Sequence, residues 1–109
     1  MSEEIKVQVG SDNVFADLDL PNPEERLIKA ELARRISEII RQRALTQVEA
    51  AELLEIDQPK VSALTRGRLN GFSTTRLFRF LNALGSDVEI VVKPKPESRL
   101  TATITVIED

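Results

Sequence analysis

Apolar residues recur at spacings of three and four through the middle of the chain, a pattern that places them on one face of a helix. The first such run contains Ile28, Leu32 and Ile36. It follows Asn22 and Pro23, which suit the cap and the first turn of a helix respectively. We therefore expect a long first helix with one buried face.

Two shorter helices with a tight turn between them are expected next. Thr46 and Glu49 have the spacing of a capping box, and the apolar pattern that follows them ends near Leu54. Asp57 or Gln58 begins the next helix, because the proline that follows is tolerated only in a first helical turn. This arrangement is typical of a helix-turn-helix, which sets its second helix into the major groove of DNA.

A fourth helix is predicted between Ser73, a good N-cap, and Gly85, a good C-terminal residue. Beyond it the pattern becomes β-rich over 88–92 and again over 100–106, with a loop containing two prolines between them. We therefore predict a C-terminal β-hairpin. Because two strands alone are marginally stable, we expect this hairpin to pack or pair with something, such as a second copy of the chain.

These patterns divide the 109 residues into three parts within one domain-sized chain. Residues 1–21 form an N-terminal strand and arm, residues 22–85 a helix-turn-helix DNA-binding domain, and residues 86–109 the hairpin, which we expect to be the dimerisation element. In the arm, apolar residues are interrupted by acids, so it either packs on its own domain or docks a partner. The residues of this possible docking segment are Val14, Phe15, Asp17 and Leu18.

The composition excludes several chemistries. With no Cys and no His, the chain cannot form a zinc finger, a thiol nucleophile or a serine–histidine triad. No constellation of nucleophile, base and orienting group is evident, so we expect no catalytic residues, no metal and no cofactor, and the chain is not expected to be an enzyme. No apolar run approaches the length of a membrane span, and we expect a cytoplasmic protein that joins the nucleoid when it binds DNA.

The net charge of −3 is distributed unevenly. Residues 1–25 carry seven acids and a single lysine, whereas residues 58–80 carry five basic side chains and no acid. Because salt screens charges over roughly 10 Å, affinity for phosphate depends on the local patch more than on the total. The asymmetry favours nucleic acid on residues 58–80 and a basic partner for the N-terminal segment.

The chain resembles two related groups of proteins. Residues 36–85 look like the Cro/cI-type (XRE) repressor domain, with Glu55 at the turn position where that family usually has glycine. The longer pattern, including 13–18, 57–62 and 66–73, resembles the HigA-like antitoxins of bacterial toxin–antitoxin operons. The resemblance implies a mainly α fold: a four- to five-helix lambda-repressor-like helix-turn-helix domain, here with a C-terminal β-hairpin.

The resemblance also implies roles for individual residues. The groove-facing, base-reading positions of the second helix are held by Gln58, Pro59, Lys60, Ser62 and Ala63. Gln58 can bond adenine through two hydrogen bonds, and Pro59 can touch a thymine methyl. The residues expected to bind phosphate are Gln47, Arg66, Arg68 and Ser73 with its neighbouring N–H groups.

We therefore expect a homodimeric autorepressor that binds double-stranded DNA at a pseudo-palindromic operator. If the antitoxin resemblance holds, the protein also neutralises an mRNA-cleaving toxin, a basic ribonuclease in that family. Two alternatives stay open. One is a stand-alone phage- or restriction-type repressor with no toxin partner, and the other is a protein-interaction module that has lost DNA binding.

Overall fold

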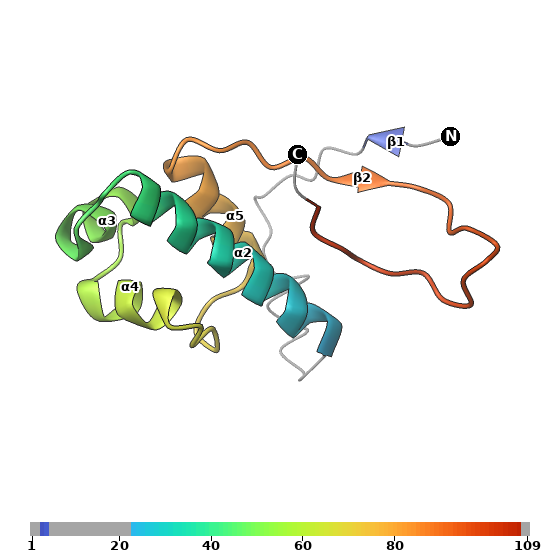
Figure 1. Cartoon of the computed structure of the whole chain (residues 1–109), viewed down its shortest axis with the longest axis horizontal. Helices are drawn as coiled ribbons and strands as arrows, with labels where there is room; N and C mark the ends of the chain where they lie inside the picture. The colour runs from blue at the N-terminus through green and yellow to red at the C-terminus, as the bar shows by residue number, and fades with distance from the viewer. Residues whose placement is uncertain (1–2, 5–22, 108–109) are drawn as a thin grey trace.

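The computed structural model describes residues 3–4 and 23–107 (Figure 1). Over these residues the chain forms four helices and two strands of two residues each. They are β1 (Glu3–Glu4), α2 (Pro23–Gln42), α3 (Gln47–Leu54), α4 (Gln58–Thr65), α5 (Thr74–Ala83) and β2 (Val91–Val92). The predicted fold class, mainly α with a helix-turn-helix, is confirmed. The expected N-terminal strand and arm, residues 1–21, lie largely outside the described residues.

Side chains cap the starts of the three shorter helices. At α3, the Thr46 hydroxyl accepts a hydrogen bond from the Glu49 N–H (3.1 Å), and the Glu49 carboxylate accepts one from the Thr46 N–H (2.8 Å). This is the capping box that the sequence predicted. Asp57 caps α4 and Ser73 caps α5, each accepting from the N–H three residues on. The first orphan N–H groups of these helices are thus satisfied by their own local sequence.

All four helices end with the same backbone motif, in which one residue turns into the left-handed region. At α4 and α5 that residue is Gly67 (φ 77°) and Gly85 (φ 92°). At α2 and α3 it is Ala44 (φ 53°) and Glu55 (φ 56°), which carry a Cβ. In each case the N–H of the next residue bonds a carbonyl five residues back, as Ile56 does to Ala51 (3.1 Å). Each helix therefore stops sharply and redirects the chain.

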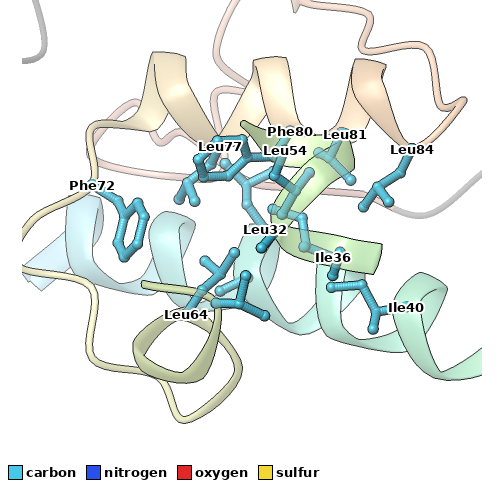
Figure 2. Close-up of a cluster of buried hydrophobic side chains, with 14 of the residues drawn as sticks. Leu32, Ile36, Ile40, Leu54, Leu64, Phe72, Leu77, Phe80, Leu81 and Leu84 are labelled. Atoms are coloured by element: carbon cyan, nitrogen blue, oxygen red, sulfur yellow. The ribbon is translucent and has the colours of Figure 1, made fainter. Parts of the chain in front are cut away.

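One apolar core joins the helices (Figure 2). Side chains of α2 and α5 face each other, and residues of α3, α4 and the loop before α5 complete the cluster. The largest fully buried side chains are Ile36, Leu64, Leu77 and Val61. The core members drawn and labelled are Leu32, Ile36, Ile40, Leu54, Leu64, Phe72, Leu77, Phe80, Leu81 and Leu84. The long helix α2 and the helix α5 thus form the support on which the α3–α4 pair rests.

Polar contacts reinforce this support. The Arg43 guanidinium, just beyond α2, donates to the Leu84 carbonyl (3.1 Å) at the C-terminal end of α5, where a cation is favoured by the helix dipole. On the outer face of α2, Arg34 bonds Glu31 (2.6 Å) and Glu38 (2.8 Å). The hydrogen bond from Arg34 lowers the pKa of the Glu31 carboxyl below its usual range.

The prediction of a C-terminal β-hairpin is wrong for the part of the chain that the structure describes. β2 pairs with β1 from the other end of the chain, antiparallel, with Glu3 opposite Val92 and Glu4 opposite Val91. Residues 100–106 form no strand. The connection between β2 and residues 100–106 contains Pro94 and Pro96, which lack the N–H groups that a ladder of hydrogen bonds requires. It leads the chain away from β2 as a wide loop (Figure 1).

Candidate nucleic-acid interface

The α3–α4 pair has the geometry of a helix-turn-helix. The two helices pack through small and aliphatic side chains: Ala50 and Ala51 on α3 are buried, as are Val61 and Leu64 on α4. The small side chains of α3 allow α4 to approach closely. Glu55 sits at the turn in the left-handed conformation that a glycine would adopt without strain. The turn therefore forms although a residue with a Cβ occupies its left-handed position.

The N-terminal part of α4 is presented to solvent. Gln58, Pro59 and Lys60 are exposed, whereas Ser62 and Ala63 are half-buried along the same helix. Pro59 lies in the first turn, where it removes no intrahelical hydrogen bond. Because the opposite face of α4 is held in the core, the exposed face has a fixed orientation. These five positions are the ones predicted to read bases, and the structure leaves the first three accessible.

The turn after α4 carries two arginines on a defined backbone. The Gly67 N–H bonds the Leu64 carbonyl (3.2 Å), and the Arg68 N–H bonds the Ala63 carbonyl (2.9 Å). Gly67 adopts φ 77°, which places Arg66 and Arg68 on either side of a tight reversal. Both arginines are exposed. Two guanidinium groups therefore flank the C-terminal end of α4, where phosphate contacts were predicted.

The two remaining predicted phosphate residues stand at helix N-termini. Gln47 is the exposed first residue of α3. Ser73 is half-buried, and its hydroxyl accepts from the Arg76 N–H (3.1 Å), so its side chain is engaged as a cap. The contribution of this position to phosphate binding would therefore come from the backbone N–H groups at the start of α5, which carries a positive partial charge.

Arg76 is a residue whose role the sequence reasoning missed. Its guanidinium lies 5.3 Å from the ring centroid of Phe72 and 5.5 Å from that of Phe80, and it reaches the Gly71 carbonyl (3.4 Å). The two rings contact each other edge to face, with centroids 5.9 Å apart. Arg76 thus ties the loop before α5 to the core rather than extending toward a ligand. The spacing of four residues from each phenylalanine was the available signal.

Across residues 3–4 and 23–107, no group of three or more acidic, histidine or cysteine side chains is arranged to hold a metal ion. Within the same residues, no helix has the length and apolar character needed to cross a membrane. The docking residues predicted in the arm, Val14, Phe15, Asp17 and Leu18, lie outside the described part of the chain.

The fold, with the second helix of the pair exposed, is that of an XRE-type helix-turn-helix domain. The family described as "Helix-turn-helix domain" matches residues 14–93, and the chain belongs to this family. The fold and the family are those of DNA-binding regulators.

Two relatives refine this placement. A solved structure titled "Putative XRE Family Transcriptional Regulator" is 48% identical and superposes with a TM-score of 0.78, covering 82% of this chain and 100% of that one. The chain is also 33% identical over 61 residues to the "Putative antitoxin HigA2" of Mycobacterium tuberculosis (strain ATCC 25618 / H37Rv). That match covers 56% of this chain and 60% of the relative's length.

Proposed function

We propose that the protein is a sequence-specific autorepressor that binds a pseudo-palindromic operator as a homodimer. The observation that carries the proposal is the exposed N-terminal part of α4, Gln58 to Lys60, on a helix fixed by the core and flanked by Arg66 and Arg68. In helix-turn-helix dimers the two recognition helices enter successive major grooves about 34 Å apart. The proposed operator therefore contains two half-sites separated by one helical turn.

The proposed contacts fall into two groups. Gln58, Pro59, Lys60, Ser62 and Ala63 read base edges from α4. Gln47, Arg66, Arg68 and the N-terminal end of α5 at Ser73 hold phosphates and fix the register. A residue of the first group affects which sequence is bound, whereas a residue of the second group affects binding to every sequence.

This division is tested with the protein's own promoter fragment and a scrambled duplex of equal length, each titrated over a series of salt concentrations. Specific binding that weakens steeply with salt is expected, because bound phosphates release counterions. Gln58→Ala should reduce the preference for the promoter by an amount equivalent to about 1–3 kcal/mol, the usual value of one bidentate base contact. If Gln58→Ala left the preference intact, the base-reading assignment would be wrong.

The double variant Arg66→Ala/Arg68→Ala serves as the comparison. It should weaken binding to both duplexes alike and reduce the slope of log K against log[salt] by about two units, roughly 0.9 for each lost phosphate contact. Equal and weak binding of the wild-type protein to both duplexes would contradict the repressor function and favour a protein-interaction role.

The second part of the proposal is that the protein neutralises a basic ribonuclease toxin through its acidic N-terminal arm. Two observations support it: the relative named as an antitoxin, and the seven acids among residues 1–25. The arm residues Val14, Phe15, Asp17 and Leu18 are proposed to dock the toxin.

The test pairs the protein with the product of a small basic reading frame beside its gene, and mRNA cleavage by that product is measured. The wild-type protein should suppress cleavage, while Phe15→Ala/Leu18→Ala should suppress it poorly and still bind the promoter. Unimpeded cleavage in the presence of the wild-type protein would leave a stand-alone repressor.

A further inference from the structure

The C-terminal segment of the chain displays apolar side chains that the helical core does not cover. Of the large hydrophobic residues exposed among the described residues, most lie after residue 89. The most exposed of these are Leu100 (99%), Ile107 (77%) and Ile104 (58%). Such a concentration outside the core marks an interaction surface rather than scattered surface residues.

The sequence of this segment has the pattern of a strand. From Leu100 to Val106 the even positions are apolar and the odd positions are all threonine. Residues 100–107 contain no charge, in a chain of which 30% is charged. β-branched residues in strict alternation favour pairing with another strand. Within the described residues this segment pairs with none.

The contacts of the segment show which edge faces α2. The Ile104 N–H donates to the Glu24 carboxylate of α2 (3.2 Å), and Val106 packs against the core. In an extended chain, alternate residues direct their N–H groups to opposite edges. The Thr103 and Thr105 N–H groups therefore point away from α2 when the segment is extended, and neither bonds a partner in the described part of the chain.

We propose that residues 100–106 pair, antiparallel, with the same segment of a second copy, with Thr103 on the twofold axis. In this register Leu100 lies opposite Val106 and Ala102 opposite Ile104, so apolar side chains oppose apolar side chains. Thr101 lies opposite Thr105, which gives the cross-strand threonine pairs that antiparallel sheets favour. A twofold interface requires a segment that complements itself in this way.

The charges that flank the segment agree with an antiparallel pair. The nearest charge before it is Arg99, and the nearest after it is Glu108. Antiparallel pairing brings the basic side of one copy to the acidic side of the other, whereas parallel pairing would bring like charges together. This inference names the dimer contact of the proposed repressor and rests on that function only for the requirement that the protein be a dimer.

Cysteine cross-linking tests the register directly, because the chain has no cysteine of its own. Residues facing each other as a hydrogen-bonded antiparallel pair have Cα atoms about 5.5 Å apart, which suits a disulfide. Under mild oxidation Thr103→Cys should form a covalent dimer. Thr101→Cys and Thr105→Cys should each stay uncrosslinked alone and link when mixed. A dimer in which Thr103→Cys fails to cross-link would overturn the register.

Sedimentation of the full chain without DNA tests whether this segment makes the dimer. Ile104→Lys should raise the dimer dissociation constant at least tenfold, while Val48→Lys, an equally drastic change at an exposed position of α3, should leave it unchanged. A wild-type monomer, or no effect of Ile104→Lys, would refute the proposal. Promoter binding is measured separately. A dimer that binds the operator but does not cross-link would reject the strand pairing and leave the proposed function intact. A cross-linked dimer that does not bind the operator would reject the proposed function and leave the strand pairing intact.

Discussion

At the scale of single residues, the helical domain contains two strained positions. Ala44 and Glu55 adopt positive φ values at the ends of α2 and α3, where Gly67 and Gly85 serve the other two helices. A left-handed conformation costs a residue with a Cβ roughly 1–2 kcal/mol. The hydrogen bonds that close the turn and the packing of α3 against α4 must outweigh this strain.

Glu55→Gly should therefore stabilise the protein by about 1 kcal/mol, because the relief of strain exceeds the extra entropy that glycine gives the unfolded chain. The free energy of unfolding in urea measures the change. Glu55→Ala, which removes the charge but keeps the Cβ, is the matched control and should give no comparable gain. Equal stabilisation by both variants would show that the charge, not the backbone, is the cause.

A second residue-scale prediction concerns Glu31. Its pKa is lowered mainly by the hydrogen bond from Arg34. Since the folded-state pKa lies below the unfolded one, the stabilisation is present above the unfolded pKa and is lost as pH falls through the folded pKa. NMR titration should find the Glu31 pKa below its usual range in the wild type and closer to that range in Arg34→Gln. An unchanged Glu31 pKa in the variant would assign the shift to another cause.

At the scale of the elements, the helices could be predicted from local sequence because their boundaries are encoded locally. The caps Thr46, Asp57 and Ser73 each act within three residues of themselves. The strands could not be predicted in the same way. β2 pairs with β1, which is more than eighty residues away in the chain. The alternation in residues 100–106 indicates that a strand can form there, but not which partner covers it.

The cap of the recognition helix α4 provides the element-scale prediction. Asp57→Ala removes the acceptor of the Lys60 N–H (3.0 Å) and should lower the free energy of unfolding by about 1 kcal/mol. Asp57→Asn keeps a capping oxygen and should be close to wild type. Urea unfolding measures both. If Asp57→Asn were as unstable as Asp57→Ala, the charge at the helix N-terminus would matter more than the hydrogen bond.

At the scale of the whole molecule, the candidate interface depends on the core that holds α4 in place. Of the predicted residues, the structure exposes Gln58, Pro59 and Lys60 on α4 and Arg66 and Arg68 in the turn after it, while Ser62 and Ala63 are half-buried. The charge pattern of residues 58–80 had indicated from sequence that this region is basic. The role of Arg76 was not predicted, because its cation–π contacts depend on how the loop before α5 folds back onto that helix. Spacing alone does not determine such a contact.

The dependence of stability on the core can be measured by making the same leucine-to-alanine substitution at a buried site and at an exposed site. Leu77 on α5 is fully buried, whereas Leu27 on α2 is 72% exposed. Leu77→Ala should lower the free energy of unfolding by about 2–5 kcal/mol through lost burial and a residual cavity. Leu27→Ala should change it little. For a domain whose total stability is on the order of 5–15 kcal/mol, the first change leaves a small margin.

Promoter binding should follow the folded fraction in the same pair of variants. Neither leucine belongs to the proposed interface, so any loss of affinity should come from unfolding. Leu77→Ala should lose apparent affinity as the temperature rises and regain it on cooling, while Leu27→Ala should bind as the wild type does. Because DNA binds only the folded state, the promoter fragment should raise the melting temperature of both variants. A loss of affinity by Leu77→Ala at temperatures where it is fully folded would contradict this dependence on the folded fraction.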